Sequence, residues 1–367
     1  MIKRMDFKKV AGIVFVLPLI MMLLPVSALS SHEYEDTEEM ELSADGIRKL
    51  GIVASSCDVN ITGVKGAESI LVKITRFVRV ESEEKARELA GKMRVRVKEK
   101  DEAIELVTEY PGSGEKSINI IDAIFGGGRK LRMELDITVP ESMELTFETS
   151  SGDIEIEDIA AGVGISSASG DVEARMIGGK MAVKTASGDI RADNIESFAA
   201  ETASGDIYIR KVGGSCVISA ATGDVNAEDV GGSVVIQTIS GDVGVENISG
   251  STEIRSASGS VDIEEAAGGV KAFTASGDLH VEASPEQGEK KYELGTSSGS
   301  LTLIFRRILE GGYALKASTL SGEIEMELPI QISGMTRQKV TGVVREGESR
   351  VLIETSSGDI TIKEKGA

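Results

Sequence analysis

The sequence is poor in aromatic residues, cysteine and histidine, and each shortage excludes a class of protein. Aromatic residues make up 4 % of the 367 residues and tryptophan is absent, which disfavours a thick core and favours a thin one of valine, isoleucine and alanine. Two cysteines and two histidines leave too few ligands for zinc, haem or iron–sulfur chemistry. With 40 basic against 60 acidic residues, the chain also lacks the clustered basic surface that nucleic acids or anionic membranes require.

The one long hydrophobic run lies at the N-terminus and has the features of a targeting segment. Four basic side chains precede an uncharged apolar stretch at residues 10–28. Val26, Ser27 and Ala28 form the small-residue pattern of a signal-peptidase site, so residues 1–28 are predicted to be a signal peptide. An uncleaved anchor at residues 10–28 is the alternative, because this length approaches what spans a bilayer. Either way, the protein is expected to be secreted or displayed at the cell surface.

The segment after the hydrophobic run is strongly acidic. Residues 29–42 contain six acidic side chains and neither lysine nor arginine. Because like charges repel one another, this acidic leader is predicted to be a solvated tether, with a functional acidic tail as the alternative.

An 18-residue repeat dominates the rest of the chain. The tripeptide Ser-Gly-Asp, or a close variant of it, recurs at intervals of 17 or 18 residues. The glycines of this series are Gly152, Gly170, Gly188, Gly205, Gly223, Gly241, Gly259 and Gly277. Later copies at Gly299, Gly322 and Gly358 follow at longer intervals, which indicates small insertions and then either a two-coil stretch or one large insertion.

The apolar residues keep a fixed place within each repeat. If the aspartate is position 1, then positions 2, 4, 7, 11 and 13 are apolar in nearly every copy, whereas positions 3 and 5 are mostly polar. This alternation is typical of two short strands per repeat. Such a pair can bury its apolar face only by stacking on the next coil. The sequence therefore predicts an all-β fold, a parallel β-solenoid or two-sided β-helix with 18-residue coils. A β-propeller blade would need a longer, four-stranded repeat.

The two flanks of the regular repeat are predicted to close its ends. Ser56, Cys57 and Asp58 match the repeat corner with cysteine in place of glycine, which places a first coil at residues 43–64. A strand at Ile70–Val80, a helix at Ser82–Met93 capped by Ser82, and further strands near residues 94–98 and 103–109 then form a small α+β capping insertion. The predicted domains are 1–28, signal peptide or anchor; 29–42, acidic leader; 43–140, first coil and α+β cap; 141–299, regular solenoid; and 300–367, irregular C-terminal coils and cap.

These motifs resemble those of a prokaryotic β-solenoid family known as the "putative adhesin" domain, a domain of unknown function. The Cys57–Asp58 corner, the Thr138–Pro140 segment, the Ser-Gly-Asp series and the final Ser357–Asp359 copy carry the resemblance. It covers about residues 45–364. The resemblance implies the solenoid fold and a role in surface adhesion, but the shared residues are corners and core and define no chemistry.

The sequence nominates no catalytic, cofactor-binding or metal-binding residue. A polysaccharide-cleaving β-helix enzyme, the remote alternative, needs convergent acids and bases in a groove built by long loops. Here the corners are short glycine turns, and His280 is a single outward residue. We therefore expect an exported, non-catalytic, adhesin-like protein that presents a repetitive acidic face to a glycan or protein ligand. The other alternative is a structural spacer or envelope-stress component without a ligand of its own.

Two residue sets carry narrower predictions. Cys57 and Cys216 are expected not to pair, because several coils separate them, and Cys57 is expected to be the more reactive thiol. The corner aspartates either accept turn N–H groups or bind divalent cations between coils, and the first is favoured because one carboxylate per coil supplies few calcium ligands. The members of this column are Asp153, Asp171, Asp189, Asp206, Asp224 and Asp242.

Overall fold

The fold is almost entirely strand in the part of the chain that the structure describes. The computed structural model describes residues 17–19, 32–111, 130–285, 288–308 and 311–365, and within them it contains one helix, α1 (Glu83–Ala90). The chain divides into two compact units, residues 1–179 and 180–367. The predicted all-β class with a small α+β portion near the N-terminus is confirmed. The predicted signal peptide lies outside the described residues, except for β1 (Leu17–Leu19).

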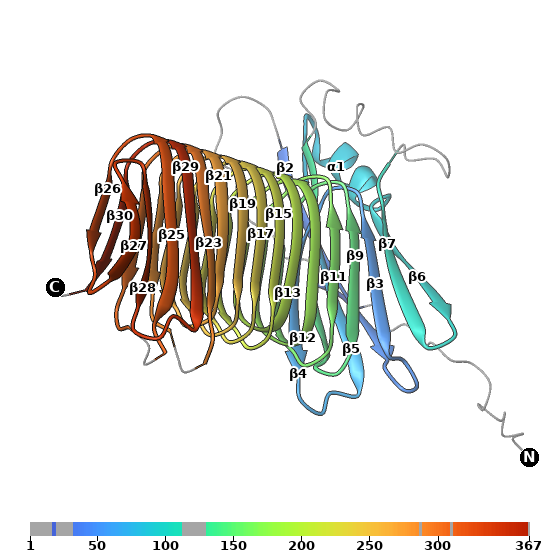
Figure 1. The fold of residues 1–367 in the computed structure, drawn as a ribbon. Coiled ribbons are helices and arrows are strands. Elements are labelled where there is room, and N and C mark those ends of the chain that lie inside the picture. Colours follow the sequence, from blue (N-terminus) through green and yellow to red (C-terminus); the bar gives the residue numbers. More distant parts are fainter. Residues whose placement is uncertain (1–16, 20–31, 112–129, 286–287, 309–310, 366–367) are drawn as a thin grey trace, which may run out of the picture. The chain divides into compact units, whose positions relative to one another are not determined.

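Unit 1 contains two stacks of parallel strands (Figure 1). One stack has the order β8 (Lys130–Pro140), β4 (Cys57–Val64), β10 (Ile154–Ile159) and β12 (Val172–Ser187). The other has the order β7 (Ala103–Glu109), β3 (Lys49–Ala54), β9 (Glu144–Thr149) and β11 (Val163–Ser167). The coil β3–β4 is therefore first in the sequence but lies between two coils that follow it in the sequence. Its register on β10 confirms that Cys57 and Asp58 occupy the corner positions of Gly152 and Asp153.

Antiparallel strands and the helix cover the outermost coil of unit 1. Strand β5 (Ser69–Val80) pairs antiparallel with β8 and with β2 (His32–Ser43), and β6 (Arg94–Lys100) pairs antiparallel with β7. Helix α1 contacts β5 and β2. Its N-cap is Ser82, as predicted, and the Ser82 side chain accepts a hydrogen bond from the Lys85 N–H at 3.4 Å.

The prediction that residues 29–42 are a solvated tether is wrong for the described part of this segment. Strand β2 pairs with β5 along its whole length. Asp36 and Glu38 accept hydrogen bonds from the guanidinium of Arg76, which is 4 % exposed and also donates to the Met93 carbonyl oxygen at 2.7 Å. Met40 is buried farther along the same strand. A buried arginine, distant in the sequence, thus pairs with two of the six acidic side chains, and backbone pairing with β5 orders the strand as a whole.

Unit 2 is a two-sided parallel β-solenoid with one strand from each coil in each sheet (Figure 1). We call the strands after the aspartate corner the first-half sheet and the others the second-half sheet. From the coil at β13 (Ile190–Ser204), which supplies both sheets, the first-half sheet continues through β14 (Ile207–Val212), β16 (Val225–Val230), β18 (Val243–Ile248), β20 (Val261–Ala266), β22 (Leu279–Ala283) and β24 (Leu301–Phe305). The second-half sheet continues through β15 (Cys216–Thr222), β17 (Val234–Ser240), β19 (Thr252–Ser258), β21 (Val270–Ser276) and β23 (Lys291–Ser298).

The inward positions are those that the repeat predicted. Val243 and Val245, at positions 2 and 4, are at most 3 % exposed, and Ile248 at position 7 is fully buried. The buried positions alternate at 2 and 4, but the next one, position 7, is three residues later. This longer step occurs because position 6 has a positive φ and turns the strand. The residues in this conformation, with φ between 55° and 62°, are Asp158, Met176, Asn194, Lys211, Asp229, Asn247 and Glu265. Aspartate and asparagine tolerate this conformation best among residues other than glycine.

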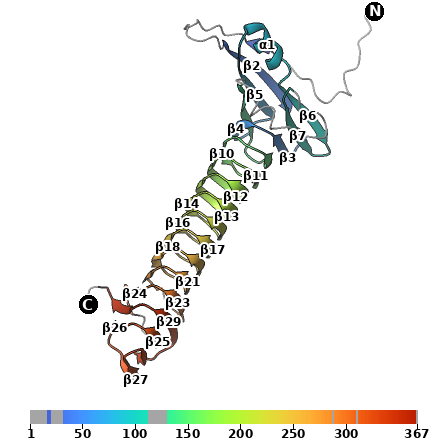
Figure 2. The same ribbon diagram turned by 90° about the horizontal axis from the view of Figure 1, so that it is seen from above.

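The C-terminal strands of unit 2 stack out of sequence order (Figure 2). The last coil, β29 (Ser349–Ser357) and β30 (Ile360–Glu364), lies between the coil β23–β24 and the coil formed by β25 (Tyr313–Ser321) and β26 (Ile324–Glu327). The long interval before Gly358 is one large insertion, a hairpin of β27 (Gln331–Thr336) and β28 (Lys339–Val344) that pairs antiparallel with β25. The rings of Tyr292, Phe305 and Tyr313 fill the core of these coils, with Phe305 and Tyr313 stacked at 4.3 Å between centroids.

Candidate functional site

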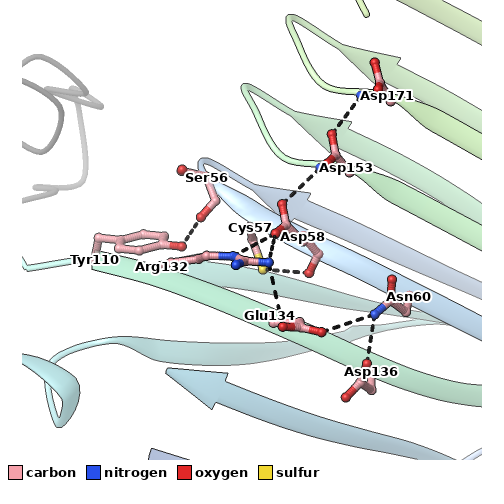
Figure 3. Close-up of polar contacts among 10 residues, drawn as sticks. All are labelled: Ser56, Cys57, Asp58, Asn60, Tyr110, Arg132, Glu134, Asp136, Asp153 and Asp171. Atoms are coloured by element: carbon pink, nitrogen blue, oxygen red, sulfur yellow. Dashed lines mark hydrogen bonds and ion pairs between the residues drawn. The ribbon is translucent and has the colours of Figure 1, made fainter. Parts of the chain in front are cut away.

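The most regular polar feature is a ladder formed by the corner aspartates. In unit 1, Asp153 donates its backbone N–H to Asp58 Oδ1 at 3.1 Å, and Asp171 donates to Asp153 Oδ1 at 2.9 Å (Figure 3). Each carboxylate thus accepts the backbone N–H of the next corner. One oxygen of Asp58 and one of Asp153 are thus occupied by the fold itself.

The same ladder runs through unit 2. Asp206 donates its N–H to Asp189 Oδ1 at 3.0 Å, and Asp224 and Asp242 continue the series, each at 2.8 Å. Ser260 also donates its N–H to Asp242 at 2.7 Å. Serine can therefore take the donor's place, because the donor is a backbone group and only the acceptor must be a carboxylate.

The glycine that precedes each aspartate is required by close approach of the backbones. Gly241 has a φ of 122°, and a Cβ atom at this residue would lie 2.1 Å from the carbonyl oxygen of Gly223. No side chain fits at that distance, so the corner needs glycine for both conformation and space. The aspartate ladder and the close backbone contacts at the corner glycines together explain the Ser-Gly-Asp repeat structurally, without a ligand.

The corner carboxylates do not converge into a metal site within the described residues. No group of three or more histidine, cysteine, aspartate or glutamate side chains there is arranged to hold a metal ion. The ladder supports the local explanation of the aspartate column. Whether the second carboxylate oxygens also bind divalent cations stays a prediction, with calcium expected to raise the melting temperature no more than magnesium does.

The ladder of unit 1 begins at a cluster of alternating charges on β4 and β8 (Figure 3). Arg132 donates from Nε to Asp58 Oδ2 at 2.8 Å, and its Nη2 lies 3.9 Å from Glu134 Oε2. Asn60 donates to both Glu134, at 3.4 Å, and Asp136, at 2.9 Å. Hydrogen bonding to Asp58 raises the pKa of the Arg132 guanidinium. The guanidinium thus supplies the second oxygen of Asp58 with a basic partner, as Arg191 does for Asp189 at 3.2 Å in unit 2.

The expectation that Cys57 is the more reactive thiol finds no support in the structure, because both thiols are buried and the pKa of each is raised. Cys57 and Cys216 are both free and buried. Burial, and then the nearby Asp58 carboxylate, raises the pKa of Cys57 far above its usual range, whereas burial alone raises the pKa of Cys216 to about 12. The thiol replaces a corner glycine but points inward, and the nearby Tyr110 hydroxyl donates to the Ser56 carbonyl oxygen (Figure 3).

A second polar column, missed in the sequence, lies inside the solenoid beside the corners. Thr185, Thr202 and Thr238 are buried, and each hydroxyl donates to the carbonyl oxygen of the serine two residues later. Ser167, Ser256 and Thr274 make the same bond. The signal was present, since a threonine or serine recurs two residues before the serine of Ser-Gly-Asp. These hydroxyls satisfy backbone carbonyls at a turn, which is a structural role.

The two outer surfaces of unit 2 differ in charge. On the first-half sheet, Glu228, Glu246 and Glu264 lie directly beside one another on β16, β18 and β20. Asp229 and Glu265 flank them, and we call these five residues the acid cluster. Partial desolvation, together with the charges of Glu264 and Glu228, raises the pKa of Glu246.

The cluster is only partly neutralised by its neighbours. Tyr208 donates its hydroxyl to Glu228 at 3.0 Å, and Arg306 forms an ion pair with Glu265 at 2.6 Å. Neither Glu246 nor Glu264 has a hydrogen-bond or ion-pair partner among the described residues. An unbalanced negative field therefore persists over three successive coils.

The second-half sheet presents apolar and paired groups instead. Val217, Ile239 and Phe273 are 47 %, 63 % and 39 % exposed. Arg255 forms an ion pair with Glu253 at 2.8 Å. The repetitive acidic face predicted from the sequence is therefore confined to one of the two sheets, and His280 lies half-buried on that same sheet, in β22.

Comparisons with known proteins show similarity at the level of a family. A protein-family model described as Toastrack DUF4097 matches residues 47–246 and 216–363. No curated protein matches the chain. Within the described residues, no helix is long and apolar enough to cross a membrane.

Several solved structures are similar over most of their length. One, named a "putative cell adhesion protein", is from Clostridium sporogenes and has 14 % identity and a TM-score of 0.21, covering 90 % of this chain and 100 % of that one. A "putative lipid binding protein" from Parabacteroides distasonis has 12 % identity and a TM-score of 0.30, covering 89 % and 96 %. A "putative adhesin" from Parabacteroides merdae has 10 % identity and a TM-score of 0.26, covering 89 % and 95 %. At these identities and TM-scores the likeness carries no argument about function.

Proposed function

We propose, from the premise that the chain belongs to the Toastrack DUF4097 family, that it is an exported, non-catalytic, adhesin-like binding module whose ligand docks on the acid cluster. The single observation that supports this is the stacking of Glu228, Glu246 and Glu264 without basic partners for the last two. Carboxylates stacked on neighbouring strands repel one another and destabilise the fold. A protein that keeps them at three successive coils gains from a ligand that neutralises them.

The geometry of the cluster defines the chemistry of that ligand. Strands of one sheet are about 4.8 Å apart, so the cluster repeats negative charge at that spacing. A linear ligand with repeated cationic groups, such as an amino-sugar polymer or a lysine-rich segment of a surface protein, complements this pattern. A solenoid suits such ligands because its own groups repeat along one axis.

Export of the chain is part of the proposal. The basic start, the apolar stretch at residues 10–28 and the Val26–Ala28 pattern support cleavage after Ala28. N-terminal sequencing of the protein from its native host is expected to find Leu29 as the first residue. A mature chain that begins at Met1 would instead support an anchor and display at the cell surface.

Binding is tested with two defined probes, a fully deacetylated glucosamine oligomer and oligolysine. The triple variant Glu228→Gln/Glu246→Gln/Glu264→Gln is expected to weaken binding of at least one probe tenfold or more, because it removes three stacked charges. The matched control is Glu201→Gln/Glu253→Gln/Glu354→Gln, which removes the same charge from the second-half sheet and is expected to bind like the wild type. If neither probe, nor any member of a glycan and cell-surface array, binds the wild type, the ligand-free structural spacer becomes the better description.

A further inference from the structure

Two edge strands of this chain carry opposite charges in the same alternating pattern. In unit 1, β6 pairs only with β7 among the described residues, and its outward row is Arg94, Arg96 and Lys98. In unit 2, β26 pairs only with β30 among the described residues, and the outward row of this segment is Glu323, Glu325 and Glu327. Each strand therefore leaves one edge of backbone N–H and C=O groups without a neighbouring strand.

The apolar rows of the two strands match as well. Val95 and Val97 alternate with the basic residues of β6 and are half-buried. Ile324 and Met326 alternate with the acidic residues of β26 and are also only half-buried, although the strand that they pair with, β30, has fully buried inward residues. The inward side of both edge strands is thus incompletely covered, in a protein whose other inward rows are covered almost completely.

Placing Arg96 opposite Glu325 brings the basic row of β6 against the acidic row beside β26. These contacts would add to the ion pairs that Arg96 and Lys98 already form with Glu109 and Glu105 of β7 and that Glu323 forms with Arg337. In an antiparallel pair, this register sets Arg94 against Glu327 and Lys98 against Glu323. In a parallel pair, the partners of Arg94 and Lys98 are exchanged, and every basic residue still faces an acidic one. Opposite charges across a strand pair stabilise it, and like charges directly opposite destabilise it.

The same charges prevent each edge from pairing with its own kind. Two β6 strands would bring arginine and lysine against arginine and lysine, and two β26 strands would bring glutamate against glutamate. Charged edges of this sort are a usual protection against edge-to-edge aggregation. Here the protection acts against like edges only, because one edge is basic and the other acidic.

We propose that β6 of one molecule adds to the sheet of a second copy of this chain beside β26. The occupant of each edge is thus the other edge, and the contact is heterologous, with different surfaces on the two copies. Main-chain hydrogen bonds supply the attraction between the strands, and the alternating charges supply the specificity. The contact uses neither the acid cluster nor any ligand, so it stands independently of the proposed function.

Charge reversal at either edge tests the contact by sedimentation velocity on the chain without residues 1–28. At physiological ionic strength, the wild type is expected to form oligomers in a concentration-dependent manner. Arg96→Glu/Lys98→Glu makes both edges acidic, and Glu325→Lys/Glu327→Lys makes both edges basic. Each variant alone is expected to be monomeric, whereas an equimolar mixture of the two is expected to regain oligomers, because each edge of one then complements an edge of the other.

The control variant carries the same change of charge at a place that is not an edge. Lys180→Glu/Lys184→Glu, on β12, is expected to assemble like the wild type. Thermal melts of all variants confirm that they are folded, and the mixing experiment excludes a folding defect directly, since a misfolded chain would not regain assembly. A wild type that stays monomeric up to millimolar concentration would overturn the proposal, as would reversed variants that still assemble alone or fail to assemble when mixed.

Discussion

The regular coils of unit 2 and its C-terminal strands are built from the same kinds of strand but are held together differently. From β14 to β23, each coil stacks on the coil that precedes it in the sequence. At the C-terminus, the last coil, β29–β30, instead stacks between β23–β24 and the coil β25–β26 that precedes it in the sequence. A regular coil thus depends on neighbours about 18 residues away, whereas the C-terminal coils depend on strands that arrive much later in synthesis.

Unit 1 shows the same arrangement with the sequence order reversed. Here the first coil, β3–β4, has the later strands β7 and β8 stacked on its outer side. In both units, antiparallel strands then pair with the outermost coil. These strands are β5 and β6 in unit 1, and β28 and β27 in unit 2. The comparison indicates that the repeat builds the middle of the solenoid, while strand insertion and antiparallel pairing complete the coils where the repeat becomes irregular.

Deleting residues 349–367 tests this comparison with the largest expected effect. The deletion removes β29 and β30, so β23–β24 keep only the coil β21–β22, and β25–β26 lose the coil on which they stack, with only the hairpin strand β28 still paired to β25. We expect residues from about 313 onward to lose protection from proteolysis, as followed by limited digestion and mass spectrometry. Replacing the hairpin residues 331–344 by a short glycine–serine linker removes a peripheral element of similar size, and the β29–β30 coil should then remain protected. Equal protection in the two deletions would refute the inserted arrangement.

Within the regular coils, the largest effect is expected from a charge in the core. Val243 is 1 % exposed, and Val243→Asp leaves a carboxylate buried without a partner, at a cost of about 4 kcal/mol in the free energy of unfolding. Glu246→Gln, three residues later on the outer side of β18, is the matched control. Because the pKa of Glu246 is raised, its charge opposes folding at neutral pH, and the glutamine should leave the protein as stable or slightly more stable. Equal melting temperatures for the two variants would contradict the assigned register.

In unit 1, the key buried charge is at the cap. Arg76→Ala removes the guanidinium that holds Asp36 at 3.0 Å and also binds Glu38. Losing one partner of a buried ion pair costs about 3 kcal/mol, and hydrogen exchange should report the loss first in β2. Arg87→Ala, on the exposed side of α1 and paired with Glu83 at 2.7 Å, should cost only about 0.3 kcal/mol. Unchanged exchange in β2 of the Arg76 variant would show that backbone pairing with β5, rather than the ion pairs of Arg76, holds this strand in place.

The smallest effect is expected from a pH-dependent group of ion pairs at Glu282, which links Lys365, directly after β30, to β22. Glu282 on β22 is 7 % exposed and binds Arg306 and, at 2.6 Å, the Nζ of Lys365. Burial alone would raise the pKa of Glu282, but hydrogen bonds from Lys365 and Arg306 lower it overall. The carboxylate therefore adds stability at pH values above its unfolded pKa of about 4.3, and this stability is lost as the pH falls through the lower folded pKa.

The substitution Glu282→Gln measures how much these ion pairs contribute to the free energy of unfolding. At neutral pH the substitution should cost about 1.5 kcal/mol, and the difference from the wild type should shrink as the pH falls below about 4. Glu354→Gln, which loses an exposed ion pair with Lys316 at 3.2 Å, should cost no more than about 0.5 kcal/mol at any pH. Denaturant unfolding across this pH range checks both, and a cost that is independent of pH would show that packing, rather than charge, is what Glu282 contributes.

The sequence alone determined the coil, because each of its rules is local. Positions 2, 4 and 7 point inward as expected, and the Ser-Gly-Asp corner is fixed by a close backbone contact at each glycine and by a carboxylate ladder wherever the corner residue is aspartate. The early corner at Cys57 and the Ser82 cap were predictable for the same reason. The domain boundaries at residues 140 and 299 stay predictions.

Only the tertiary structure decided the features that join residues distant in the sequence. The acidic segment forms strand β2 because it pairs with β5 and because Arg76, some forty residues later, binds two of its acidic side chains. No local pattern records that pairing. The coil β29–β30 stacks between β23–β24 and β25–β26, and this place depends on which strand edges are unpaired when residues 349–364 are synthesised. Likewise, the concentration of acid on one sheet follows from stacking, which brings Glu228, Glu246 and Glu264 side by side although 18 residues separate each from the next.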